Sequence, residues 1–591
     1  MNAKAMDAVQ QKNKTIDSVT LQVIWNNLVT TADEMSINLQ RSAYSSNIKT
    51  RRDHSCAIFD SSSRTLAQAH DQPAHLGLLS MSVPLALKDY GSDNIEEGDM
   101  IALNDPYHGS AHLPDITIIS PAYYKGKLSG YVVNLAHHQD VGGMTPGSVP
   151  GNATEIWQEG LIIPVIKIVR KGELIGDMLK FILANVRGSR DRLGDYRAQI
   201  AANKYGAIRL SNMFDKYGEE IAKLYIEAIL DYTERAVRRE IQAKLPEGSY
   251  KAFDYLDNDG VEDRPIKIGV EIIVKNGSIS FDFSSSDKQT KGVINSTLPC
   301  VTSACAFIVK SLTDPDLPIN DGFYRAIKII APEGSVVNAK RPAAVGGTWE
   351  VIQRCVDAMI KALSEVVPER LSAAGKGIIC NITFGGINPR TGSNYAFYET
   401  QAGGFGGRLG RDGPDAVQYA IHNTENTPVE ELESTLPIRI LKYELVKESE
   451  GPGKFRGGFG VRKDYKFLDH EATFSLLSDR AKSQPWGLVG GKSAKSARYI
   501  LNPESQDEQI LSSKVVLHLK KDEIVSIQTP GGGGYGNPNE RDPDLVLRDY
   551  QDGLISQQRA LKEYSVDIDS TRLTTNKFLG SGASDTGKEM E

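Results

Sequence analysis

Two apolar runs that flank a short turn restrict the fold more than any other feature of this sequence. Residues 116–123 and 128–135 are rich in Ile, Val, Leu and Tyr, and Lys125-Gly126-Lys127 separates them. This pattern predicts two strands joined in an antiparallel hairpin. With the turn centred near residue 126, Asp115 and His137 fall opposite each other at the open end of the hairpin.

That open end carries residue types that bind divalent metal ions. Directly opposite residues lie about 4.5–5.5 Å apart at Cα, and His112 joins Asp115 and His137 from a turn that Pro114 keeps from becoming a helix. Two imidazoles and a carboxylate suit Zn²⁺, with Mn²⁺ or Fe²⁺ as alternatives, and three protein ligands leave a position open for water or substrate. Hydrogen bonding at a sheet edge is the alternative role for these histidines, but their clustering favours a metal.

His138 and Asp140 lie one and three residues after the predicted ligand His137. Their types and position predict either an acid/base pair or side chains that orient the ligands. The alternative is that both belong to a solvated loop.

Helical periodicity and a second hairpin predict an α+β protein. A stripe of apolar residues predicts a helix that ends near residue 41, and a helical stretch over 196–245 ends at Pro246 and Gly248. Alternating apolar residues on both sides of Asn276-Gly277 predict a hairpin with a primed turn, and 349–363 predicts a further helix. We therefore expect a multi-domain, mixed fold with substantial antiparallel sheet and long flanking helices. The first stripe consists of Leu21, Trp25, Leu28, Ala32, Met35 and Leu39.

These boundaries divide the chain into four segments. They are an N-terminal metal-binding domain (16–248), a central α/β domain (249–400), a C-terminal domain rich in glycine and β structure (401–577), and a flexible tail (578–591).

Composition excludes several classes of function. The chain has 68 basic and 75 acidic residues, and its net charge of -7 argues against a nucleic-acid partner. No apolar run approaches the roughly 18 residues that a membrane span needs. The polar first 15 residues lack the apolar core of a secretion signal, so we expect a cytoplasmic protein. Five cysteines without a C-x-x-C pair predict free thiols.

Two glycine-rich stretches resemble nucleotide-binding loops without meeting their requirements. The stretch 487–493 has Trp486 where a phosphate loop needs glycine, and Asn537-Pro538 follows 531–536 where a dinucleotide-binding helix should begin. We expect the glycines at 403–407 and 451–460 to serve tight turns or close approach of the backbone rather than phosphate binding.

The motifs around the predicted ligands resemble the hydantoinase B family, over residues 16–555. That family is related to the carboxyl-terminal half of ATP-dependent 5-oxoprolinase and to subunits of acetone and acetophenone carboxylases. The motifs that carry the resemblance are Arg41-Ser42-Ala43-Tyr44, Asp53-His54-Ser55-Cys56-Ala57, His75-Leu76-Gly77, Asn104-Asp105-Pro106-Tyr107, His112-Leu113-Pro114-Asp115, His137-His138-Gln139-Asp140, Gly194-Asp195-Tyr196-Arg197 and 530–536.

The resemblance implies a metal-bearing subunit of a hetero-oligomer. The family's metal ligands fall on His112, Asp115 and His137, with Asp53 as a further ligand. A hydantoinase A-like partner would bind ATP with Mg²⁺ and phosphorylate the substrate. The expected reaction is ATP-dependent hydrolysis of a cyclic amide: a hydantoin, 5-oxoproline or a lactam such as caprolactam. The alternatives are a subunit of an ATP-dependent ketone carboxylase and a non-catalytic scaffold with a structural metal.

Overall fold

The computed structural model describes residues 16–75, 77–569 and 574–577. The predicted tail 578–591, the segment 1–15 considered for a secretion signal, and Leu76 of the His75-Leu76-Gly77 motif lie outside these residues. In the described part of the chain, every helix is too short or too polar to span a bilayer. The five cysteines are free and buried, as predicted.

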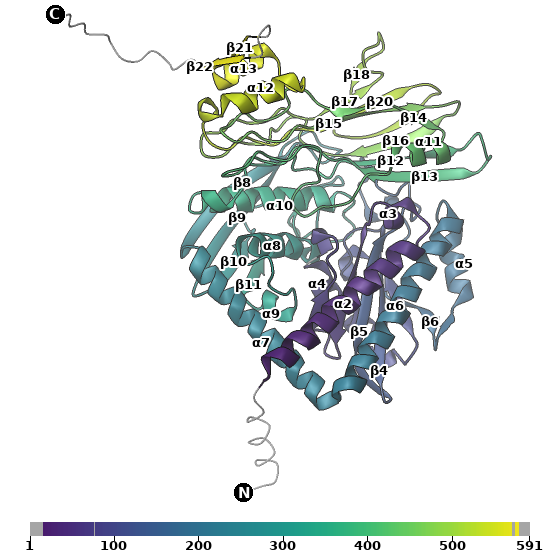
Figure 1. Cartoon of the computed structure of the whole chain (residues 1–591). Helices are drawn as coiled ribbons and strands as arrows, with labels where there is room; N and C mark the ends of the chain where they lie inside the picture. Colours follow the sequence, from purple (N-terminus) through teal and green to yellow (C-terminus); the bar gives the residue numbers. More distant parts are fainter. Residues whose placement is uncertain (1–15, 76, 570–573, 578–591) are drawn as a thin grey trace, which may run out of the picture.

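An antiparallel sheet forms the N-terminal part of the described chain (Figure 1). Its order, β2-β1-β5-β4-β3-β6-β7, places the predicted hairpin β4–β5 at the centre. The strands are β1 (His54–Asp60), β2 (Thr65–Gln68), β3 (Met100–Leu103), β4 (Asp115–Tyr124), β5 (Lys127–His137), β6 (Ile166–Arg170) and β7 (Glu173–Leu174).

The register of the central hairpin is the one predicted, because Asp115 pairs with His137. The turn is one residue shorter than expected: Lys125 and Gly126 both have positive φ, and Lys127 already pairs with Tyr124. A register shift between Ala122 and Tyr123 then adds a residue to one strand, and this β-bulge restores the predicted pairing.

Long helices cover one face of this sheet (Figure 1). The predicted first helix is α2 (Ser18–Ser42), which packs along α6 (Ser189–Tyr217) with Leu28, Met35 and Leu39 in the core. The predicted stretch 196–245 is two helices rather than one, because Gly218 has φ 78° and separates α6 from α7 (Glu219–Lys244). The shorter helices here are α3 (Ser46–Lys49), α4 (Leu78–Tyr90) and α5 (Gly176–Ala184).

A second sheet, with the order β11-β10-β9-β8, follows the predicted break at Gly248. Asn276 and Gly277 have φ 50° and 67°, which confirms the primed turn of the β9–β10 hairpin. The strands are β8 (Gly248–Leu256), β9 (Ile266–Lys275), β10 (Ser278–Asp282) and β11 (Ile327–Ile330), and the helices beside them are α8 (Leu298–Leu312), α9 (Asp321–Tyr324) and α10 (Thr348–Leu363).

Two further sheets pack against each other in the C-terminal part around one apolar core. Their orders are β13-β12-β16-β19 and β14-β15-β20-β17-β18. The mixed, multi-domain architecture agrees with the predicted fold class. The domain division stays a prediction. The predicted boundary at residue 400 falls within one sheet, because β12 and β13 lie at or before residue 400 and β12 pairs with β16, which lies after it. The strands are β12 (Asn381–Ile387), β13 (Asn394–Thr400), β14 (Ile438–Leu445), β15 (Val461–Phe467), β16 (Ala472–Leu477), β17 (Arg498–Leu501), β18 (Gln509–Ile510), β19 (Lys514–Leu519) and β20 (Ile524–Gln528), with α11 (Val429–Thr435) beside β14.

The glycine-rich segments approach one another closely, as predicted for 403–407 and 451–460. Gly404 N–H donates to Pro530, and Gly532 N–H donates to Gly458. A Cβ atom on Gly404 would lie 2.1 Å from the carbonyl oxygen of Gly458, so only glycine allows this approach. The chain then adds α12 (Pro543–Gln551), α13 (Gln557–Tyr564), β21 (Val566–Asp569) and β22 (Thr574–Lys577).

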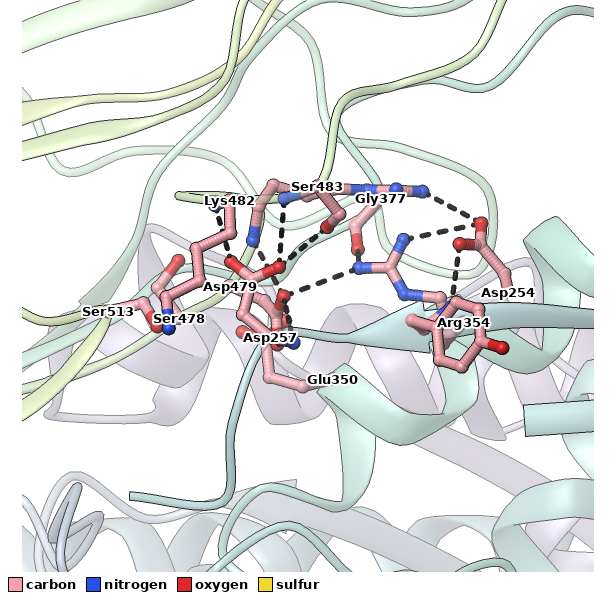
Figure 2. Close-up of polar contacts among 12 residues, drawn as sticks. Asp254, Asp257, Glu350, Arg354, Gly377, Ser478, Asp479, Lys482, Ser483 and Ser513 are labelled. Atoms are coloured by element: carbon pink, nitrogen blue, oxygen red, sulfur yellow. Dashed lines mark hydrogen bonds and ion pairs between the residues drawn. The ribbon is translucent and has the colours of Figure 1, made fainter. Parts of the chain in front are cut away.

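A buried network of ion pairs joins the central part of the chain to the C-terminal part (Figure 2). Arg354 of α10 donates to Asp357 at 3.0 Å and to the carbonyl of Gly377, and it lies between Asp254 and Asp479. Arg480 donates to Asp254 at 3.1 Å and to Asp357 at 2.7 Å. Both arginine side chains are fully buried, so each charge depends on its partners for stabilisation.

Candidate metal centre

The hairpin end and the turn before it bring three buried side chains together. One ligand atom from each of His112, Asp115 and His137 lies within 4.8 Å of the other two. Nε2 of His112 is 3.4 Å from Oδ2 of Asp115, and the two imidazole centroids are 5.0 Å apart. The predicted ligands therefore form a compact cluster.

The donor atoms of this cluster lack hydrogen-bond partners. Both nitrogens of His112, both carboxylate oxygens of Asp115 and Nε2 of His137 are buried without one. Such atoms are rare in folded proteins, because an unsatisfied buried polar atom costs about 1–3 kcal/mol. Two imidazoles and a carboxylate that converge in this way fit a divalent ion such as Zn²⁺, Mn²⁺ or Fe²⁺.

Backbone contacts fix the turn that supplies His112. Asp115 N–H donates to the carbonyl of His112 at 3.0 Å, and Ser110 Oγ donates to the carbonyl of Asp115 at 2.9 Å. The Asn104 amide donates to the carbonyl of Leu113 at 2.7 Å. The turn is therefore held from several sides, so it can present His112 to the strand end.

Mutual electrostatics set the protonation of the cluster. Burial alone would lower the pKa of His112, but the Asp115 carboxylate outweighs burial and raises that pKa. Conversely, burial opposes ionisation of Asp115, but attraction to His112 lowers its pKa below the usual value. Burial, together with the charge of His112, holds the pKa of His137 well below its ordinary value. His137 is therefore neutral, which is the form of imidazole that ligates metals.

Asp53 lies beside the cluster at the start of β1. His137 N–H donates to the backbone carbonyl of Asp53 at 3.0 Å, and the Gln72 amide donates to its carboxylate at 3.3 Å. Burial raises the pKa of Asp53 to about 6. The three-residue cluster does not include its carboxylate, so its role as a fourth ligand stays a prediction.

His138 and Asp140 are engaged with other parts of the fold. The His138 ring lies against Tyr196, and its Nε2 is 2.9 Å from Oε1 of Gln199. Asp140 accepts from Arg187 and from the N–H of Gly142. Both are buried, so the alternative of a solvated loop is wrong. These contacts suit side chains that hold the loop after His137, and direct acid/base roles stay predictions.

A polar contact from α3 orients His137. Nδ2 of Asn47 lies 3.1 Å from Nδ1 of His137, and Arg51 donates to Oδ1 of Asn47 at 2.9 Å. The Arg51 guanidinium also lies over the ring of Tyr398, 4.9 Å from its centroid. A ring nitrogen held from behind leaves the other nitrogen, Nε2, directed into the cluster.

Aromatic rings close the sides of the cluster. Tyr398 stacks on His137 with centroids 4.3 Å apart, and the Tyr398 hydroxyl donates to Asn381 at 2.9 Å. Trp349 at the start of α10 lies edge-on to His112, with centroids 6.4 Å apart. These rings exclude water from the imidazoles, and they connect the site to the second and third sheets.

Sequence reasoning did not identify several of these residues. His75, whose ring centroid lies 6.0 Å from that of Trp349, belongs to the His75-Leu76-Gly77 motif, and Arg51 lies two residues before Asp53, so proximity to a motif was the available signal. Asn47, Trp349 and Tyr398 gave no such signal, because tertiary packing brings them to the site from distant elements.

Comparisons with known proteins identify relatives along most of the chain. The family described as Hydantoinase B/oxoprolinase matches residues 17–538. A protein of Pseudomonas sp. (strain NS671), described as the candidate B subunit of a D-/L-hydantoinase, is 34% identical over 95% of this chain and 97% of its own length. The crystal structure of ATP-dependent caprolactamase from Pseudomonas jessenii superposes with a TM-score of 0.88 at 29% identity, over 94% of this chain and 98% of that one. A nucleotide-free structure of acetone carboxylase shares the fold with a TM-score of 0.86 at 20% identity, over 94% of this chain and 81% of that one.

Proposed function

Because the chain belongs to the hydantoinase B/oxoprolinase family, we propose that it is the metal-bearing subunit of an ATP-dependent cyclic-amide hydrolase. The proposed substrates are a hydantoin, 5-oxoproline or a lactam such as caprolactam. The observation that carries the proposal is the buried cluster of His112, Asp115 and His137, whose donor atoms converge without partners. The names of the relatives support the reaction class.

The proposed metal ligands are His112, Asp115 and His137, with Asp53 as a fourth. Zn²⁺ is the proposed ion, and Mn²⁺ or Fe²⁺ fits the same donors. When bound, such an ion would supply Lewis acidity that lowers the pKa of water, so that water can attack the phosphorylated amide near neutral pH.

The chain's own residues prepare the site for this chemistry. Asn47 holds His137 in one orientation through Nδ1, while Tyr398 and Trp349 exclude water from the imidazoles. A dry site strengthens each electrostatic interaction within it. His138 and Asp140 hold the loop that follows His137, which keeps the strand end in register.

A hydantoinase A-like partner subunit completes the proposed enzyme. It would bind ATP with Mg²⁺ and phosphorylate the ring amide, so that the amide becomes electrophilic. The designation of a relative as a B subunit supports a hetero-oligomer.

The test is an assay of the complex with its ATP-binding partner on cyclic amides and ketones, with and without bicarbonate. The proposal predicts ATP-dependent ring opening that needs no bicarbonate. Turnover of a ketone only with bicarbonate, with release of a carboxylated product, would identify a ketone carboxylase instead. Full hydrolysis after a chelator has removed the metal would show that the metal takes no part in the reaction.

Replacing Asn47 by Ala is expected to weaken metal binding without unfolding the chain. The variant loses the contact that orients His137, and loss of such a partner typically reduces metal affinity by about 10–100-fold. Competition with a chromophoric chelator measures the change. Asn38→Ala, at an exposed position on α2, is the matched control and should bind as tightly as the native chain. Equal affinity in the Asn47 variant would show that this contact does not support the ligand.

A further inference from the structure

A pocket of about 710 Å³ lies between α2, the segment after β2 and the loop after α8. We call it the α2 pocket. Exposed residues such as Gln22 and His70 line its outer part, so it opens to the surface. Its lining also includes Ala69 and Lys310.

The inner part of the α2 pocket adjoins the metal cluster. Ser55, Gln72 and His75 line it, and Ser55 Oγ lies 2.8 Å from Nδ1 of His75. Gln72 donates to the Asp53 carboxylate, as described above. The rings of His75 and His112 both lie beside Trp349, with centroid distances of 6.0 and 6.4 Å. The same side chains therefore border the pocket on one side and the cluster on the other.

The pocket does not reach the donor atoms of the cluster directly. None of the three clustered ligands lines the pocket, and their donor atoms are buried. Gln72 and His75, the last residue of the 3₁₀ helix η1 (Pro73–His75), line the pocket and contact residues beside the cluster. A reactant that reaches the cluster from this side has to pass Gln72 and His75.

Two other pockets of comparable volume lie away from the cluster. The pocket of about 820 Å³ is lined by residues between 447 and 556, and the one of about 640 Å³ by residues between 385 and 520. None of their lining residues belongs to the cluster or to the neighbours of the cluster described above. Of these three pockets, the α2 pocket is therefore the best placed to lead to the metal cluster.

We propose that the α2 pocket is the route by which a small polar reactant reaches the metal cluster, and that Gln72 and His75 form the wall at its inner end. This inference rests on the proposed function, and it assigns the path of the cyclic amide. The lining includes polar side chains such as Gln22 and Gln72, which suits a polar molecule of that class.

Blocking the pocket tests this route. The variant Ala69→Trp, made in the full chain, places a large side chain in the α2 pocket. Diethyl pyrocarbonate, which modifies accessible imidazoles, then probes access to each histidine. Peptide mass spectrometry measures the extent of modification. We expect labelling of His75 and His112 in the metal-free protein to slow by about tenfold or more, because the reagent loses its path. Exposed His108 serves as the internal reference and should react at the native rate. Transfer of Zn²⁺ from the loaded protein to dipicolinate should slow in parallel.

The matched control is Ala207→Trp, which fills a separate pocket of about 380 Å³ beside α6. This control should leave unchanged both the labelling rate of His75 and His112 and the rate of Zn²⁺ transfer. Native labelling and native Zn²⁺ transfer in a folded Ala69→Trp variant would overturn the route. If that variant does not fold, Val29→Trp blocks the same pocket from α2. A native chain that retains no metal would refute the proposed function, whereas the labelling rates would still decide the route.

Discussion

Replacing His137 by Ala should abolish metal binding and reduce ring-opening activity by about 10³-fold or more. The reason is that Lewis-acid stabilisation contributes several kcal/mol to the transition state, and each 1.36 kcal/mol corresponds to a factor of about ten. Asp115→Asn, which keeps the shape of the side chain and removes its charge, should act in the same direction. Elemental analysis of the purified chain and assay of the complex with its partner measure the two effects.

The matched control for His137→Ala is His108→Ala. His108 belongs to the same histidine-rich stretch, but it lies on the surface beside Asp89. We expect this variant to keep native metal content and activity. If Asp115→Asn remained active at native metal content, these residues would not be the catalytic ligands. If Asp115→Asn disrupted the complex with the partner instead of reducing the activity of an intact complex, the alternative of a non-catalytic scaffold with a structural metal would be favoured.

The second large effect is on stability. Arg480→Met leaves the carboxylates of Asp254 and Asp357 buried and without one of their partners. Removing one member of a buried ion pair typically costs about 3–5 kcal/mol. We therefore expect a marked fall in the urea concentration at the midpoint of unfolding. Circular dichroism measures this midpoint.

Two further variants test whether burial and charge explain the expected loss of stability. Arg264→Met removes an exposed partner of Glu262 and should leave the unfolding midpoint unchanged, because solvent screens that pair. Adding Asp254→Asn to Arg480→Met should recover part of the lost stability, because it removes one of the negative charges that the network then carries in excess. A native midpoint for Arg480→Met alone would show that the network does not hold the two parts of the chain together.

The central hairpin was predictable because its determinants are local. The turn residues and the alternation of the strands fix which residues pair, so Asp115 could be placed opposite His137 before any tertiary contact was known. The prediction succeeded although the turn is one residue shorter than expected, since the bulge at Ala122 and Tyr123 compensates. A bulge has no reliable signal in a single sequence.

Features that depend on distant segments were not predictable in this way. The arginines of the buried network resemble surface residues in the sequence, because nothing local reveals that Asp254, Arg354 and Arg480 will meet. Tyr398 reaches His137 only because β13 lies against the end of the first sheet. Similarly, Gly218 stood inside a helical pattern, and only its backbone conformation shows that the helix ends there.

Anomalous X-ray diffraction from crystals of the chain, purified without chelators, tests the metal site most directly. Data at the zinc, manganese and iron edges would locate and identify the ion. We predict one strong peak about 2.0–2.2 Å from donor atoms of His112, Asp115 and His137. Absence of a peak at all three edges, with the three side chains placed as they are here, would contradict the metal-dependent function.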